Sequence, residues 1–328
     1  MGKNRILVTA IGSSAAGIVI KELQRYGFYV VGTDIYPKEW LVDSFRADGF
    51  YQVPRADKGE EFIDAVIDIC GREDVRYIIP LTDVEVDAFN RFRKRFSGLG
   101  ICLCMQDEGT VSLCRDKRKA AWHLRECCRV IPEVAREELA DWKDFPLICK
   151  RTNGRSSLGL HRFSSAREIC AFMEDKGDEY MIQPMIEGEV ITADVLRDRD
   201  HDRCVVYARE ELLRTGNGLG VVVKMFYDGY LEEQCREMAE RLDIVGCVNF
   251  EFIRDREGAY YFMECNPRFS GGVEFSALAG YPFVINHLNC FLGKCIDEAS
   301  VPDSITIARK YETYITDMGD GRDVPIIP

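Results

Sequence analysis

Apolar runs and amphipathic stretches alternate through the first hundred residues of the chain. Short apolar runs at 5–12, 28–34 and 75–81 are typical of buried strands, whereas the apolar residues of 13–27 and 59–73 recur at helical spacing. Strands that alternate with helices predict a parallel sheet covered by helices. We therefore expect residues 1–106 to form a Rossmann-like α/β domain.

The rest of the chain follows a different pattern. Residues 107–127 are helical and strongly charged, and a strand-like segment over 146–150 ends in Lys150 and runs into a glycine-bearing loop. A strand–linker–strand pattern follows over 182–196, and short strands and helices alternate beyond it. The length of 328 residues suffices for two or three domains.

Two β-prone runs, 247–253 and 259–266, flank the short polar turn Arg-Asp-Arg-Glu-Gly. This pattern predicts a β-hairpin. With an even-length turn, Glu251 and Glu264 become diagonal neighbours on one face, roughly 7–8 Å apart, and Asn266 lies on the same face.

In this predicted register, Glu251 faces Phe262 and Asn249 faces Glu264; an odd-length turn would break the agreement. Two carboxylates that converge without a cation repel each other, and a divalent ion removes the conflict. Oxygen ligands from Glu251, Glu264 and Asn266 suit Mg²⁺. A solvated strand face is the alternative that these residues leave open.

The residues after the hairpin favour the metal hypothesis. Pro267 ends the strand, Arg268 places a planar cation beside the carboxylates, and Gly271 and Gly272 allow close approach of the backbone. This combination is more specific than the hairpin alone.

Three other segments are ambiguous by themselves. The loop Asn-Gly-Arg-Ser-Ser-Leu-Gly after Lys150 has N–H groups that can surround phosphate oxygens, but it is also typical of a plain turn. Lys117 lies at a charged helix start, where a solvated lysine is the usual outcome. The backbone of Gln183–Ile186 suits an adenine ring and Glu189 suits ribose hydroxyls, although a strand–turn–strand unit is the simpler interpretation.

Composition and charge exclude several classes of function. The formal net charge of −12 disfavours nucleic acid as a partner, because phosphate backbones are repelled. No apolar run reaches the ~18–20 residues that span a bilayer, and MGKNRILVTAIGSS has no signal-peptide pattern. We expect a cytoplasmic protein without a membrane partner.

The 14 cysteines are expected to be reduced, and the four scattered histidines show no zinc-site spacing.

Taken together, these segments resemble the ATP-grasp superfamily. The resemblance covers nearly the whole chain and is carried in order by RDK (115–117), PLICKRTNGRSSLG (146–159), IQPMIEGE (182–189), VNFEFI (248–253) and FMECNPRFSGG (262–272). Within the superfamily the chain is similar to single-module carboxylate–amine ligases that resemble half of the carbamoyl-phosphate synthase large chain, including the pyrrolysine-pathway amino-acid ligase. The resemblance implies an α/β fold in three parts: a Rossmann-like pre-ATP-grasp domain at 1–106, a small ATP-grasp subdomain with the phosphate loop at 107–180, and a large subdomain with the metal site at 181–328.

The resemblance also implies a role for each candidate residue. Those that would bind ATP are Lys117, Lys150, Ser156, Ser157, Gln183, Met185, Ile186 and Glu189. The lysines and serines would contact the phosphates, the next three residues the adenine, and the glutamate the ribose. The ligands of one or two Mg²⁺ ions, with Mn²⁺ as an alternative, would be Glu251, Glu264 and Asn266. Arg268 and Lys150 would act in catalysis, Arg268 by orienting the substrate carboxylate and stabilising the acyl phosphate.

Two positions depart from the pattern of the relatives. Many relatives have Gln or Asp where this chain has Glu251, which still supplies oxygen ligands. Residues 214–224 do not closely follow the synthase pattern, and we expect them to form part of the acceptor pocket. Synthase-like substrates are therefore not expected.

The implied reaction begins when a carboxylate oxygen attacks the γ-phosphate of ATP and forms an acyl phosphate. An amine then attacks the carbonyl and phosphate leaves. Because acyl phosphates hydrolyse, we expect the loop at 154–159 to close and exclude water. No side-chain nucleophile is needed, and strand alternation points Cys265 into the core. The expected partners are a small-molecule carboxylate, with an amino acid or peptide as the leading candidate, an amine, and a second copy in a homodimer.

Three alternatives remain at this level. A nicotinamide-dependent dehydrogenase would explain Gly-Ser-Ser-Ala-Ala-Gly (12–17) and Asp34, but Ser14 replaces the middle glycine of that fingerprint. A carbamoyl-phosphate or carboxylase-type enzyme would use bicarbonate, although a full synthase needs two modules. A non-catalytic ATP-binding regulator is the third.

Overall fold

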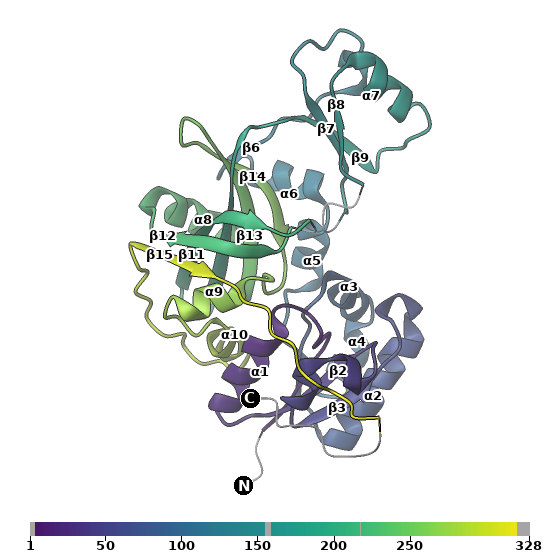
Figure 1. Ribbon diagram of the computed structural model, residues 1–328, viewed down its shortest axis with the longest axis vertical. Coiled ribbons are helices and arrows are strands. Elements are labelled where there is room, and N and C mark those ends of the chain that lie inside the picture. Colours follow the sequence, from purple (N-terminus) through teal and green to yellow (C-terminus); the bar gives the residue numbers. More distant parts are fainter. Residues whose placement is uncertain (1–3, 155–158, 217, 320–328) are drawn as a thin grey trace.

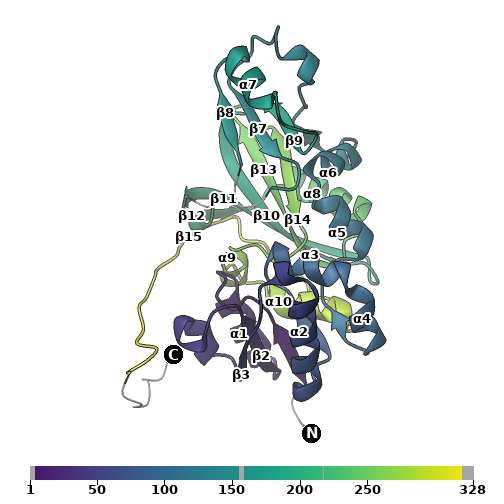
Figure 2. The same cartoon turned by 90° about the vertical axis from the view of Figure 1, so that its right-hand side faces the viewer.

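Three β-sheets follow one another along the long axis of the molecule. In the computed structural model, which describes residues 4–154, 159–216 and 218–319, a five-stranded and a three-stranded sheet lie at opposite ends and a seven-stranded sheet lies between them (Figures 1 and 2). The candidate active site is on the seven-stranded sheet, facing the two others.

The five-stranded sheet is parallel, with strand order β3-β2-β1-β4-β5, as expected for a Rossmann-like fold. Its strands are β1 (Arg5–Val8), β2 (Tyr29–Asp34), β3 (Gly49–Gln52), β4 (Tyr77–Ile79) and β5 (Cys102–Leu103). Its helices are α1 (Ala16–Arg25), α2 (Glu60–Glu73), α3 (Asp83–Arg91) and α4 (Arg93–Gly98). Alternation along β1 explains the two cores: Ile6 and Val8 pack toward α1, and Leu7 packs toward α2. The predicted α/β class is confirmed.

The seven-stranded sheet has the order β15-β12-β11-β10-β13-β14-β6 and is antiparallel except between β14 and β6. Its strands are β6 (Arg129–Val130), β10 (Gly188–Asp198), β11 (Arg203–Arg214), β12 (Gly220–Phe226), β13 (Gly246–Asp255), β14 (Tyr260–Asn266) and β15 (Ser304–Ala308). The helices near it are α5 (Glu108–Cys114), α6 (Lys117–Leu124), α8 (Gly229–Arg241), α9 (Val273–Leu278) and α10 (Phe283–Phe291). Helices α6 and α8 cover one face, and α9 and α10 cover the other.

The three-stranded sheet is antiparallel and forms the outermost part of the molecule (Figure 1). It consists of β7 (Leu147–Arg151), β8 (His161–Phe163) and β9 (Tyr180–Pro184), with α7 (Ala166–Met173) against one side. Short 3₁₀ helices occur at Lys38–Trp40, Val42–Phe45, Ala56–Lys58 and Arg136–Glu138.

The charged stretch predicted to be helical over 107–127 forms two helices, α5 and α6. The second begins because the carboxylate of Asp116 accepts hydrogen bonds from the N–H groups of Arg118 and Lys119, both at 3.1 Å. This cap places Lys117 in the first turn of α6, against β14.

A buried histidine joins the five-stranded and seven-stranded sheets. His287 of α10 accepts a hydrogen bond at Nδ1 from the N–H of Cys247 (2.9 Å), and its Nε2 lies 3.0 Å from the carbonyl oxygen of Cys104. Burial lowers the pKa of His287 to about 4, so the imidazole is neutral. One side chain thus connects the end of β5 to the start of β13.

All 14 cysteines are free thiols in the structure. Within the described ranges, no helix combines the length and apolar character that crossing a membrane requires.

Candidate active site

The carboxylate hairpin, β13 and β14, has a register that differs from the predicted one. Next to the turn, Phe252 pairs with Phe262, which corresponds to an odd-length turn. Met263 is then an extra residue on β14, and beyond this bulge Glu251 lies directly opposite Glu264. The predicted pairing of Glu251 with Phe262 was therefore wrong.

The bulge restores the shared polar face that an odd-length turn alone would have lost. Each extra residue in a strand moves the following side chains to the other face. Here the shift brings Glu264 and Asn266 to the face that holds Glu251 and Asn249, with Asn249 opposite Asn266. Cys265 points the other way and is buried in the core, as predicted.

The side-chain amide of Asn266 lies at the centre of this face. Its Nδ2 is 3.1 Å from Oδ1 of Asn249, 3.2 Å from Oε1 of Glu251 and 3.4 Å from Oε1 of Glu264. The amide therefore holds both carboxylates in place. Four oxygen-bearing side chains on two paired strands make a rigid platform for an oxygen-preferring cation.

Two lysines from other elements approach the carboxylates. Lys117 Nζ lies 2.8 Å from Glu264 Oε2 and donates to the carbonyl oxygen of Gly154 at 2.6 Å, so it connects α6, β14 and the loop after β7. Lys150, on β7, is half-buried; desolvation, against the opposing charge of Glu264 and with a smaller contribution from Lys117, lowers its pKa to about 8.

The two glutamates respond differently to this environment. Burial and, second, the charge of Glu264 raise the pKa of Glu251 to about 7. Burial would also raise the pKa of Glu264, but Lys117 and then Lys150 hold it below its ordinary value. The site therefore carries one stably ionised carboxylate and one that is only partly ionised at neutral pH and that a further positive charge would ionise fully.

Arg268 borders the carboxylates on the side of the five-stranded sheet. Its Nη2 lies 3.0 Å from Oδ2 of Asp83, the first residue of α3, and its Nη1 donates to the carbonyl oxygen of Phe269 at 3.0 Å. Burial opposes the charge on Arg268, but Asp83 raises its pKa. Helix α3 of the N-terminal domain thus orients a side chain of the central site.

A cavity of about 350 Å³ opens above this platform. Apart from the hairpin residues, it is lined by Ser14, Asp83, Thr192, Arg209, Glu211, Arg214, Gly218, Leu219, Gly220, Arg268, Ser270, Gly271 and Gly272. Arg214 and Gly218–Gly220 in this lining belong to the segment expected to form an acceptor pocket. Arg214 and Arg268 give the cavity two cations that suit a carboxylate ligand.

The residues predicted to hold adenine and ribose lie outside the lining of this cavity. The amide of Gln183 donates to the carbonyl oxygen of Ile131 at 2.8 Å, and the N–H of Met185 donates to Pro146 at 3.1 Å. Ile186 is half-buried in the linker between β9 and β10, and Glu189 pairs with Arg254 at 3.1 Å. Their roles stay predictions, and Ser156 and Ser157 lie outside the described residues.

Sequence reasoning missed several lining residues. Arg209 and Glu211 lie two residues apart on β11, directly after the apolar run 204–208, and charges at this spacing, which share one face of a strand, were an available signal. Asp83 follows β4 at the end of the parallel sheet, where functional side chains collect. Ser14 belongs to the loop that resembles a dinucleotide fingerprint, and here it lines the cavity.

Comparison with known proteins agrees with this architecture. Residues 6–104 match the family described as PylC-like, N-terminal domain, and residues 176–313 match the family described as ATP-grasp in the biosynthetic pathway with Ter operon. A D-alanine–D-alanine ligase of Oleidesulfovibrio alaskensis is 30% identical over 149 residues. That match covers 39% of this chain and 46% of the ligase, so it spans less than half of the relative.

Solved structures resemble the chain over most of its length. Biotin carboxylase of Campylobacter jejuni has a TM-score of 0.76 at 17% identity, with 89% of this chain and 72% of that chain covered. An N5-carboxyaminoimidazole synthetase of Staphylococcus aureus, complexed with ADP, has a TM-score of 0.71 at 15% identity, covering 90% and 78%. At this identity the likeness establishes the fold. The chain therefore has an ATP-grasp fold, in which a PylC-like N-terminal domain precedes a region that matches an ATP-grasp family.

Proposed function

We propose that this protein is an ATP-dependent carboxylate–amine ligase. It activates the carboxylate of an amino acid or small peptide as an acyl phosphate and joins it to an amine, with release of ADP and phosphate. The observation that supports this most directly is the direct opposition of Glu251 and Glu264, with Lys117 at 2.8 Å and Arg268 beside them. Phosphoryl transfer needs a metal and cations in this arrangement.

The side chains on the hairpin face suit Mg²⁺, and also Mn²⁺. Glu251, Glu264 and Asn266 supply only oxygen ligands, and Glu251 needs a further positive charge to ionise fully. When bound, the ion would neutralise charge on the phosphate oxygens during transfer. These three residues would hold it.

The remaining residues would bind and orient the reactants. Lys117 and Lys150 lie where a triphosphate approaching the hairpin face would need positive charge, and Lys150, with a pKa of about 8, is mainly protonated at neutral pH. Arg268, held by Asp83, would orient the carboxylate toward the γ-phosphate and stabilise the acyl phosphate. Arg214 and Gly218–Gly220 would form the wall of the pocket for the attacking amine.

The test is ADP and phosphate release from Mg-ATP with pools of amino acids, dipeptides and small carboxylic acids, with hydroxylamine as the amine. Stimulation by one pool, with a hydroxamate formed, would establish acyl-phosphate chemistry and name the acid class. Stimulation by bicarbonate alone would support a carboxylase-type enzyme, and ATP binding without turnover in any pool would contradict the ligase proposal.

Two variants make this test specific to the site. Glu264→Gln should abolish turnover and leave the fold intact, and Arg268→Ala should reduce hydroxamate formation more than ATP affinity. Sedimentation of the same preparation tests the expected homodimer.

A further inference from the structure

A second group of metal-binding side chains lies at the far end of strand β10 from the candidate active site. Asp198 ends β10, His201 lies in the turn to β11, and Cys295 follows α10. One ligand atom from each residue, an oxygen, a nitrogen and a sulfur, lie within 4.8 Å of one another. Six residues of extended strand, about 20 Å, separate Asp198 from Thr192 in the cavity lining.

The carboxylate of Asp198 is held in place. The side chain is only 2% exposed; Oδ1 accepts from the N–H of His201 at 3.3 Å, and Oδ2 accepts from the N–H of Ile296 at 3.2 Å. Nδ1 of His201 lies 2.8 Å from Oδ2. These hydrogen bonds fix the carboxylate of Asp198 and orient the imidazole of His201 beside it.

The segment that carries Cys295 is fixed as well. The carbonyl oxygen of Ile296 accepts from Arg203 at 3.4 Å, and the N–H of Asp297 donates to Asn286 at 2.9 Å. Cys295 itself is exposed, so its thiol is accessible to solvent ions. The three ligand atoms are therefore presented by backbone that needs little rearrangement on binding.

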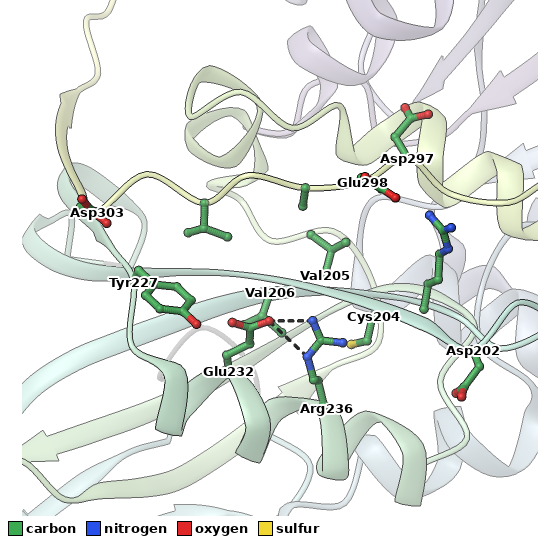
Figure 3. Close-up of a pocket in the computed structure, with 13 residues that line it drawn as sticks. Asp202, Cys204, Val205, Val206, Tyr227, Glu232, Arg236, Asp297, Glu298 and Asp303 are labelled. Carbon is green, nitrogen blue, oxygen red and sulfur yellow. Dashed lines mark hydrogen bonds and ion pairs between the residues drawn. The ribbon is translucent and has the colours of Figure 1, made fainter.

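The surroundings attract cations. Next to this cluster, between the start of β11, α8 and the segment 297–303, lies a cavity of about 640 Å³ (Figure 3). Its lining has more acids than bases: the arginines are Arg203 and Arg236, the second paired with Glu232 at 2.6 Å, and the other acids are Asp202, Asp297, Glu298 and Asp303. A concentration of acids beside the ligand group raises the local concentration of divalent ions.

We propose that Asp198, His201 and Cys295 bind a divalent transition metal ion of the zinc type, with a fourth position open to solvent. The mixture of oxygen, nitrogen and sulfur donors suits Zn²⁺ or Co²⁺, whereas Mg²⁺ prefers the all-oxygen hairpin face. Binding forms a metal–sulfur bond, and the thiol proton passes to solvent. The ion would tie the β10–β11 turn to the segment after α10. The sequence does not predict this site, because its ligands are far apart in the chain, at 198–201 and at 295.

The test is titration of the metal-free protein with Co²⁺, followed by the thiolate-to-cobalt charge-transfer absorption. Only a cysteine-bound ion gives this band, so binding at the hairpin glutamates does not contribute. We expect one Co²⁺ per chain, displaced by Zn²⁺, and a Zn²⁺-dependent rise in the melting temperature. Cys295→Ser should abolish the band, and His201→Gln should weaken binding roughly 10- to 100-fold.

Cys170→Ser and His123→Gln are matched controls elsewhere in the fold and should bind Co²⁺ like the wild type. Both test side chains are exposed, so their variants should fold. A band that persists in Cys295→Ser, or the absence of saturable binding to the wild type, would overturn the proposal.

Discussion

Two charged clusters on the same sheet differ in how their charges are arranged. On β10 and β11, Arg209 lies between two carboxylates: its Nη1 is 2.7 Å from Asp194, its Nε is 3.0 Å from Glu211, and its Nη2 donates to Ser270 at 3.0 Å. On β13 and β14, two carboxylates face each other directly and share one amide, with Lys117 bound to only one of them.

Although Arg209 and Glu211 also line the cavity, the difference separates a cluster whose charges are balanced within the protein from one whose charges are not. The Arg209 cluster alternates opposite charges, so its desolvation is offset within the protein. In the hairpin cluster like charges oppose each other: burial and, second, the charge of Glu264 raise the pKa of Glu251, and burial lowers the pKa of the neighbouring Lys150. Such unresolved conflicts mark places that a ligand completes. We expect the two clusters to respond oppositely when one charge is removed.

The largest effect should follow from Arg209→Met. The change leaves Asp194, which is fully buried, and Glu211 without their shared cation, and breaking such a pair costs about 3–5 kcal/mol of the free energy of unfolding. Urea denaturation measures this. Arg256→Met, which removes an exposed partner of Glu187, is the control and should cost below about 1 kcal/mol. Equal losses of stability in the two variants would mean that the ion pairs of Arg209 do not stabilise the fold.

Glu251→Gln should show the opposite pattern. The substitution removes one of two opposed charges, so without metal the free energy of unfolding should stay the same or increase. Mg-ATP turnover should fall roughly 100- to 1000-fold, about 3–4 kcal/mol in the barrier, because an ion ligand is lost. Denaturation without metal and turnover with Mg²⁺ check the two halves. A Glu251→Gln variant that is less stable than the wild type without metal, and still active, would show that the hairpin carboxylates stabilise the fold and do not bind the metal ion.

The two clusters also differ in how far the sequence reveals them. Apolar runs and helical spacing predict β1, β2, β4, α1 and α2 because each element buries a whole face, and that signal is local. The hairpin glutamates are identified by residue type and by the Asn-Pro-Arg-Phe-Ser-Gly-Gly segment that follows.

The sequence pattern does not predict how two register changes compensate each other, or which residues far apart in the chain make contact. The odd-length turn and the bulge at Met263 each change the register, and together they restore the shared face, so neither could be inferred from alternation. The contact between Asp83 and Arg268 joins residues 185 positions apart. Long-range packing decides both.

His287 is a third kind of buried titratable group, one that stays neutral at neutral pH. Its pKa is about 4 in the folded protein and about 6.5 in an unfolded chain, so between these pH values the unfolded state binds more protons. This residue's contribution to the free energy of unfolding is full above pH 6.5 and falls as the pH decreases toward 4, by about 3 kcal/mol in total.

Denaturation of the wild type and of His287→Gln from pH 7.5 to 4 isolates this contribution, because glutamine does not titrate. The difference in stability between the two proteins should shrink as the pH decreases. A difference that is constant with pH would mean that the imidazole joining the sheets is not kept neutral by burial.

Glu189→Gln should have the smallest effect on stability. Its effect on the KM for ATP tests the predicted ribose contact most directly. Glu189 is half-exposed, and its pair with Arg254 should contribute below about 0.5 kcal/mol to the free energy of unfolding. If the carboxylate accepts hydrogen bonds from the ribose of ATP, the KM for ATP should rise several-fold with kcat unchanged, because a contact made equally in the ground and transition states is lost. Steady-state kinetics with Glu187→Gln as the neighbouring exposed control measure this. An unchanged KM in Glu189→Gln would place the ribose elsewhere and leave Glu189 as a surface ion-pair residue.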